Sequence, residues 1–353
     1  MNSLQRSLLI PVCLIIGLSI IALSSISKDY LFLQITWIAL GTCVFLFVAY
    51  FDWRPFVNQG LGIYIIYFSS IALLFLTYLI APVIRGQRAW LIIGPLRFQP
   101  SEFAKVTLVL LLAYFFASSH TSIARFRTIF ISGILTLIPM LLVVLEPDLG
   151  SGIVFGILWF SFLLMSGLPS RYVIFFIVSA FVFSIFSWYF LLQTYQKDRI
   201  AVFLNPERDP LGVNWNVNQA KFAIGSAGFW GKGYGQGTQV QLGFLPEAHS
   251  DFIFPALIEE WGLISGFIFL LIFTYFIFIT LKIGVQSSTN FERFVVLGSA
   301  TIFCVHFVIN IGSATGLFPV VGLPLSFMSY GGSNLVSSFF LLGLLYSIAG
   351  RIS

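Results

Sequence analysis

The stretch FIFLLIFTYFIFITL, residues 267–281, contains no charged side chain and lies within an apolar run from 254 to 282. Such a run is long enough to cross a hydrocarbon core of about 30 Å, which takes about 20 helical residues. It is continuously apolar, whereas a strand of a membrane β-barrel alternates in character over about ten residues. The stretch therefore predicts a transmembrane helix.

Similar runs occur along the whole chain of 353 residues, which is 58% hydrophobic and 9% charged. Soluble domains carry about a quarter charged residues. We expect one all-α integral membrane domain, residues 1–353, with about ten transmembrane helices. They are placed at 8–26, 31–50, 60–80, 101–118, 128–145, 150–167, 170–193, 254–282, 291–314 and 333–350. No small-residue cleavage site follows the first run, so we expect a retained span rather than a signal peptide.

Lysine and arginine in the short loops predict the orientation, because these residues are enriched on the cytoplasmic side. With the N-terminus inside, the cytoplasmic face carries Arg6, Arg54, Arg125, Arg127, Arg171, Lys282, Arg293 and Arg351. The long segment 194–253, between the seventh and eighth helices, is then an external loop. The net charge of +5 reflects this bias and gives no reason to expect a nucleic-acid partner.

Four stretches on the expected outer face are rich in Gly and Pro, namely 85–105, 146–152, 205–239 and 316–334. Irregular backbone near membrane depth is tolerated only where it is buried in protein or lines a wet cavity. Several such segments on one side therefore predict a cavity that opens outward.

QPSEFAK, residues 99–105, places Glu102 and Lys105 three residues apart at a helix start, so the two side chains can pair on one face. A structural salt bridge would let both charges sit near membrane depth, where each alone costs roughly 2.5–3.5 kcal/mol on insertion scales. Alternatively, the paired lysine faces a phosphate. The two roles are compatible.

Arg88 and Arg97, with Arg85, flank Trp90 in an outer loop, against the trend that places basic residues inside. Such arginines can bind an anionic headgroup or a diphosphate in bidentate fashion. The alternative is interfacial anchoring, with Trp90 in the aromatic belt.

EPDLGSG, residues 146–152, places Asp148 where it can cap the next helix, and a capping aspartate can also shape a cavity. GSAGFWGKGYGQGT, residues 225–238, lacks the glycine spacing and the Ser/Thr after lysine that a nucleotide phosphate loop needs. We interpret it as a flexible loop in which Lys232 can contact a phosphate.

FLPEAHSDFIF, residues 244–254, places Asp251 directly before an aromatic, apolar helix start. Partial desolvation there would make Asp251 a better general base than an exposed aspartate. The alternative is that Asp251, or Ser250, caps the helix. His249 is expected to be a hydrogen-bonding partner, because His120 and His306 are predicted to lie far from it, and no metal triad is expected. Cys13, Cys43 and Cys304 lie in apolar runs and offer neither a disulfide framework nor a CxxC site.

These motifs, together with GLPLSFMSYGGSN at residues 322–334, resemble the SEDS family of bacterial cell-wall proteins, which includes RodA and FtsW. The resemblance covers nearly the whole chain. It implies peptidoglycan glycan-strand polymerisation from lipid II outside the cytoplasmic membrane, and it carries the family's essential aspartate over to Asp251. Trp90, Glu102 and Lys105 match further family sites less firmly.

The resemblance is closer to the RodA (elongation) branch, and it implies a class B penicillin-binding protein as partner. We expect Asp251 to deprotonate a sugar hydroxyl, with Arg88, Arg97, Lys105 or Lys232 stabilising the diphosphate leaving group. A divalent cation (Mg or Mn) can assist, but no cofactor is certain. The chain departs from the family pattern at supporting positions: Ala227, Val321, Ser326 and Asn334.

Two other classes compete with this interpretation. A flippase of lipid-linked precursors would be expected to carry a path of charges across the bilayer, whereas the charges here cluster outside. A non-catalytic membrane scaffold for cell-wall enzymes would bind its partner without activity.

Overall fold

The computed structural model describes residues 1–53, 55, 60–84, 86–94, 96–118, 126–190, 192–205, 212 and 214–352. Within that part, nine helices are long and apolar enough to span a membrane: α1 (Ser3–Ile26), α2 (Lys28–Tyr50), α4 (Leu61–Ile80), α5 (Pro100–Ser118), α6 (Phe126–Leu145), α8 (Ser170–Phe190), α12 (Ile253–Gln286), α13 (Asn290–Thr315) and α14 (Gly332–Ala349). Helix α7 (Leu149–Met165) is a shorter apolar helix. The predicted all-α fold is confirmed. Arg54, Arg85, His120 and Arg125 lie outside the described residues.

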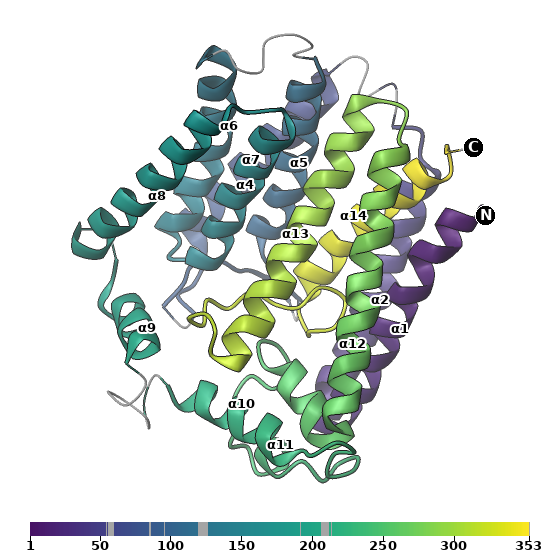
Figure 1. Ribbon diagram of the computed structural model, residues 1–353, viewed down its shortest axis with the longest axis vertical. Coiled ribbons are helices and arrows are strands. Elements are labelled where there is room, and N and C mark those ends of the chain that lie inside the picture. The colour runs from purple at the N-terminus through teal and green to yellow at the C-terminus, as the bar shows by residue number, and fades with distance from the viewer. Residues whose placement is uncertain are drawn as a thin grey trace.

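The bundle has a buried centre and one loosely packed flank. Helices α5, α13 and α14 are the most buried spans, whereas none of the described residues of α8 is buried. Figure 1 shows both termini at one end of the bundle and helices α10 and α11 at the opposite end. We call this opposite end the loop end.

The segment predicted as a long loop, 194–253, contains three helices: α9 (Thr194–Leu204), α10 (Trp215–Ser226) and α11 (Thr238–Gln241). Periodicity missed them because they are short and carry polar residues on several sides. A small antiparallel hairpin precedes α5, with β1 (Leu91–Ile93) paired to β2 (Leu96–Phe98).

Helix α12 bends sharply near its start because two glycines bring backbone segments into contact. Gly262 has a φ of 80°, outside the helical region, and a Cβ atom there would lie 2.0 Å from the carbonyl oxygen of Phe229. A Cβ atom on Gly231 would likewise lie 2.2 Å from the carbonyl oxygen of Glu260. These two glycines therefore serve close backbone packing.

The loop between α13 and α14 is anchored in the core by Phe327. This side chain is only 1% exposed and packs on Phe303 and Phe276, at ring centroid distances of 5.5 and 5.9 Å. Its φ of 63° is unusual for a residue with a side chain and costs of order 1–3 kcal/mol. Burying a phenylalanine contributes about 1.5–3 kcal/mol, which offsets that cost and fixes the loop.

Candidate active site

Asp251 lies in a segment whose backbone is bonded to the loop between α13 and α14. The amide of Tyr330 donates to the carbonyl of His249 at 2.8 Å, and the Ser329 hydroxyl donates to the carbonyl of Ser250 at 2.6 Å. The Asn310 side chain donates to the carbonyl of Asp251 at 3.1 Å. Three consecutive carbonyls are thus held by residues far along the chain.

Asn310 ties this segment to a second part of the same loop. Its Nδ2 atom also donates to the carbonyl of Leu323 at 2.9 Å, so one buried amide bridges two chain segments. A Cβ atom placed on the neighbouring Gly322 would lie 3.9 Å from Oδ2 of Asp251. The Asp251 carboxylate therefore faces the turn at Gly322.

The structure does not place Asp251 at the N-cap of α12. The N-cap of α12 is Phe252, which makes no side-chain cap hydrogen bond. The Ser250 hydroxyl instead donates to the Glu247 carboxylate at 3.0 Å. The position of Asp251 thus needs another explanation.

His249 stands in an aromatic cluster beside Asp251. Its ring stacks on Tyr30, with 3.8 Å between centroids and 10° between planes, and the Tyr330 ring lies 5.8 Å away. Burial raises the pKa of the Tyr330 phenol, while a hydrogen bond with Trp37 and the charge of Arg97 act in the opposite direction. The structure therefore places Arg97 near the segment that carries Asp251.

Glu102 and Lys105 form the predicted pair, but they do so inside the bundle. The ammonium of Lys105 donates to Glu102 Oε1 at 2.8 Å, and the two side chains are 1% and 3% exposed. Helices α13 and α14 cover the pair, so the salt bridge is buried in protein. A direct substrate contact by either residue stays a prediction that this burial does not support.

Two buried residues complete this network. The Nδ1 atom of His306 lies 2.9 Å from the carbonyl of Pro324, which makes Nδ1 the donor, so Nε2 accepts from the Lys105 ammonium at 3.1 Å. The Asn334 amide donates to Glu102 Oε2 at 3.2 Å. The network thus links α5, α13 and α14 to the loop that binds the Asp251 segment.

Asp148 caps α7 as the sequence predicts, with the amide of Ser151 donating to Oδ1 at 3.0 Å. The Gln99 amide donates to its other carboxylate oxygen at 3.0 Å. The neighbouring Glu146 is fully buried, and neither of its carboxylate oxygens has a hydrogen-bond partner among the described residues. Burial, with a smaller contribution from Asp148, raises the pKa of Glu146 to about 8.

The remaining candidates occupy separate places at the loop end. Arg88 and Arg97 are exposed, and Trp90 is half-buried. The Lys232 ammonium lies 2.7 Å from Oε1 of the buried Glu259, which also accepts hydrogen bonds from Gln239 and Val240 amides. This gives Lys232 a structural role in ordering the glycine-rich loop, and a phosphate contact by Lys232 stays a prediction.

Sequence reasoning missed several of these residues. His306 and Asn310 are four residues apart on α13 and face the same loop, and Asn334 stands at the start of α14. A polar side chain inside a membrane span is costly unless it has a partner. The two polar residues four apart in a predicted span therefore indicated a buried polar contact. Among the described residues, no group of three or more His, Cys, Asp and Glu side chains could hold a metal ion.

Together, these features define a multi-pass membrane protein with a carboxylate held at one end of its helix bundle. A family model described as cell cycle protein, covering FtsW, RodA and SpoVE, matches residues 3–352. The chain belongs to this family, as its motifs predict.

Individual relatives agree with this assignment. Peptidoglycan glycosyltransferase MrdB of Escherichia coli is 36% identical over 97% of this chain and 92% of its own length. Peptidoglycan glycosyltransferase RodA of Treponema pallidum is 30% identical over 92% of this chain and 90% of its own length.

Solved structures match the fold. A chain from a structural study of polymerization and crosslinking by a peptidoglycan synthase complex has a TM-score of 0.85 and 29% identity, covering 98% of this chain and 97% of its own. Rod shape determining protein RodA of Thermus thermophilus has a TM-score of 0.74 and 26% identity, covering 98% of this chain and 96% of its own.

Proposed function

We propose that this protein is a peptidoglycan glycosyltransferase that polymerises glycan strands from lipid II, with Asp251 as the general base. Membership of a family whose relatives bear this activity in their names supports the reaction class. The observation that carries the residue assignment is the fixation of the Asp251 backbone by Asn310 and its neighbours, with the carboxylate facing a turn at the loop end.

The reaction joins two lipid-linked sugars. The 4-hydroxyl of one sugar attacks the anomeric carbon of the other, the bond to the polyprenyl diphosphate breaks, and the hydroxyl proton passes to Asp251. A glycosidase needs a second carboxyl group as acid because its leaving group is a poor alkoxide. A diphosphate leaves as a stabilised anion, so one base is sufficient, and single displacement converts an α-linked donor into a β-linked strand.

The leaving diphosphate needs positive charge nearby. Of the four cations that the sequence suggests, Lys105 and Lys232 are already engaged with carboxylates, whereas Arg88 and Arg97 are exposed at the loop end. A divalent cation would supply further positive charge to the diphosphate when bound. The residues of this chain supply the base and the exposed arginines.

We place the loop end outside the bacterial cytoplasmic membrane. Arg6 lies in the first turns of α1 and Arg351 follows the C-cap residue of α14, so both lie at the end that carries the termini (Figure 1). This fits the enrichment of basic residues on the cytoplasmic side. Lipid II presented on the outer face would then reach Asp251 directly. An accessibility label on the α10 region tests this orientation.

We assign the protein to cell elongation and shape maintenance. Its similarity to MrdB and RodA supports this branch, and the structural likeness to a chain of a peptidoglycan synthase complex supports a class B penicillin-binding protein as partner. The partner would cross-link the strands that this protein makes.

Reconstitution with lipid II tests the function. Purified wild-type protein, mixed with fluorescent lipid II and a partner that lacks polymerase activity, should produce glycan strands whose new linkages are β by NMR. Lipid movement across vesicles without strands would instead identify a flippase, and partner binding without either activity would identify a scaffold. A strand with retained configuration would contradict single displacement.

A further inference from the structure

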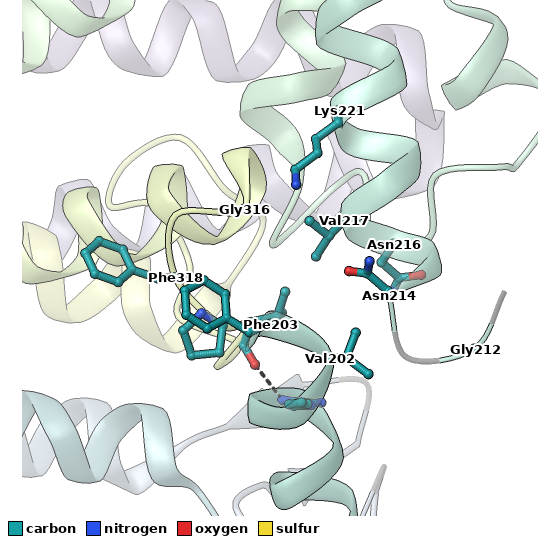
Figure 2. A pocket seen from close by; sticks show the side chains of 12 residues that line it. Val202, Phe203, Gly212, Asn214, Asn216, Val217, Lys221, Gly316 and Phe318 are labelled. Carbon is teal, nitrogen blue, oxygen red and sulfur yellow. Dashed lines mark hydrogen bonds between the residues drawn. The ribbon is translucent and has the colours of Figure 1, made fainter. Parts of the chain in front are cut away.

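Two adjoining cavities lie beside the turn that faces Asp251. The first, of about 310 Å³, lies between α9, α10 and the loop that follows α13, and its lining includes Arg199 and Lys221. Figure 2 shows Lys221 from α10 and Val202 and Phe203 from α9 around this cavity. None of its described lining residues is acidic, so we call it the basic pocket.

The second cavity is an apolar groove of about 440 Å³ between α7 and α13. Ile153 and Ile157 of α7 line one wall, and Val305 and Val308 of α13 line the other. These residues belong to the halves of both helices that are nearer the loop end. The groove therefore lies at the depth of lipid chains, and we call it the apolar groove.

The two cavities and Asp251 share one wall. Phe318 and Pro319 line both cavities, Val321 lines the groove, and the next residue, Gly322, faces the Asp251 carboxylate. Val321 adds an apolar side chain to the groove. One short loop thus borders the apolar groove, the basic pocket and the proposed base.

Both cations of the basic pocket lie against the loop that follows α13. Arg199 Nη1 donates to the carbonyl of Val320 at 3.0 Å, which holds the guanidinium against the loop (Figure 2). The ammonium of Lys221 lies where a Cβ atom on Gly316 would stand, 2.4 Å from that position. Gly316 has a φ of 78° and ends α13, so the absence of a side chain there makes room for the ammonium.

We propose that the apolar groove and the basic pocket together bind the polyprenyl diphosphate of the donor, chain in the groove and diphosphate between Arg199 and Lys221. This inference rests on the proposed function, because the anomeric carbon of the donor must lie next to Asp251. Arginine and lysine bind phosphate oxygens through charge-assisted hydrogen bonds. A phospholipid offers the same combination of chain and phosphate, so the test must separate the two ligands.

Binding of a fluorescent polyprenyl diphosphate to the purified protein tests the proposal without any need for turnover. Val308→Trp fills the groove, and Lys221→Gln removes one cation. Each should weaken binding about tenfold, which for Lys221→Gln corresponds to one lost charge-assisted hydrogen bond of about 1.4 kcal/mol. Ile157→Trp, from the opposite wall, replaces Val308→Trp if that variant does not fold.

Matched controls change residues that line neither cavity. Ile177→Trp on the exposed α8 and Lys197→Gln on α9 should bind as the wild type does. Wild-type affinity in both the groove and the pocket variants would overturn the proposal. Equal competition by phosphatidylglycerol would also overturn it, because the cavities would then be a general lipid site.

The proposed function can fail separately. A protein that binds polyprenyl diphosphate in this variant-dependent way, yet makes no glycan from lipid II, would leave this inference standing and remove the polymerase assignment. If Val308→Trp and Lys221→Gln make glycan at the wild-type rate, at lipid II concentrations below saturation, the polymerase assignment stands and this inference is removed.

Discussion

Hydrogen bonds to the backbone carbonyls of Asp251 and of the two residues before it hold Asp251 in position. Three consecutive carbonyls, from His249 to Asp251, are held by side-chain or backbone donors of α13 and the loop that follows. Such fixation of the backbone keeps the Asp251 carboxylate near one position. A general base needs this arrangement, because proton transfer depends on a heavy-atom separation of about 2.6–3.2 Å.

Glu146 shows a different way to hold a carboxyl group at the same end of the molecule. It is fully buried and has no hydrogen-bond partner in the part of the chain that the structure describes, and burial raises its pKa to about 8, from the ordinary 4.5. The folded state therefore keeps its proton up to about pH 8, whereas the unfolded chain loses it near 4.5. Stability from this group is complete below 4.5 and falls as the pH rises toward 8.

Glu146→Gln should remove this pH dependence, because glutamine does not ionise. The melting temperature of the variant, measured in detergent by intrinsic fluorescence, should exceed that of the wild type at pH 8 by at least about 2 °C, or about 1 kcal/mol. The difference should shrink at pH 5. Asp29→Asn, at an exposed carboxyl, should show no such trend, and a constant difference across this range would refute the account.

At the scale of elements, the bend in α12 depends on a residue without a side chain. Gly262→Ala would place a Cβ atom 2.0 Å from the Phe229 carbonyl at a φ of 80°. We expect the free energy of unfolding to fall by about 1–3 kcal/mol, and hence the melting temperature to fall by about 2 °C or more. Gly156→Ala is the matched control, since that helical glycine has no atom within 4 Å of the added Cβ. Equal melting of both variants would contradict the role of the bend.

The membrane spans could be predicted from the sequence because the bilayer imposes them. Backbone groups in hydrocarbon must be bonded within the segment, so a continuously apolar run such as 267–281 leaves helix as the solution. Helices α9 and α10 were not predicted, since they carry polar residues and do not span the membrane. Their structure depends on packing at the loop end, which no local pattern records.

The site could be predicted in part. The cap at Asp148 followed from its position before a helix, and the structure has it. The role of Asp251 as the base stays a prediction. The bonds from Asn310 and Tyr330 join positions about 60 and 80 residues along the chain, which only the tertiary fold brings together. The spacing of Glu102 and Lys105 predicted that they pair. It did not predict that His306 and Asn334 bury the pair.

At the scale of the whole molecule, the polar chemistry is divided between the interior and one end. The buried network around Lys105 lies within the bundle, while Asp251, Arg97 and the two cavities lie toward the loop end. The flank formed by α8 has no buried residue among those described. This asymmetry suits an enzyme that takes a lipid-linked substrate from the membrane and works at its surface.

The most direct test of the central claim is the initial rate of glycan polymerisation by purified Asp251→Asn, with Asp29→Asn as the matched control. Binding of lipid II is measured on both variants to show that the site is intact. Removal of a general base should lower the rate by about 10²–10⁴-fold while lipid II still binds. Polymerisation by Asp251→Asn at the rate of the control would contradict the account.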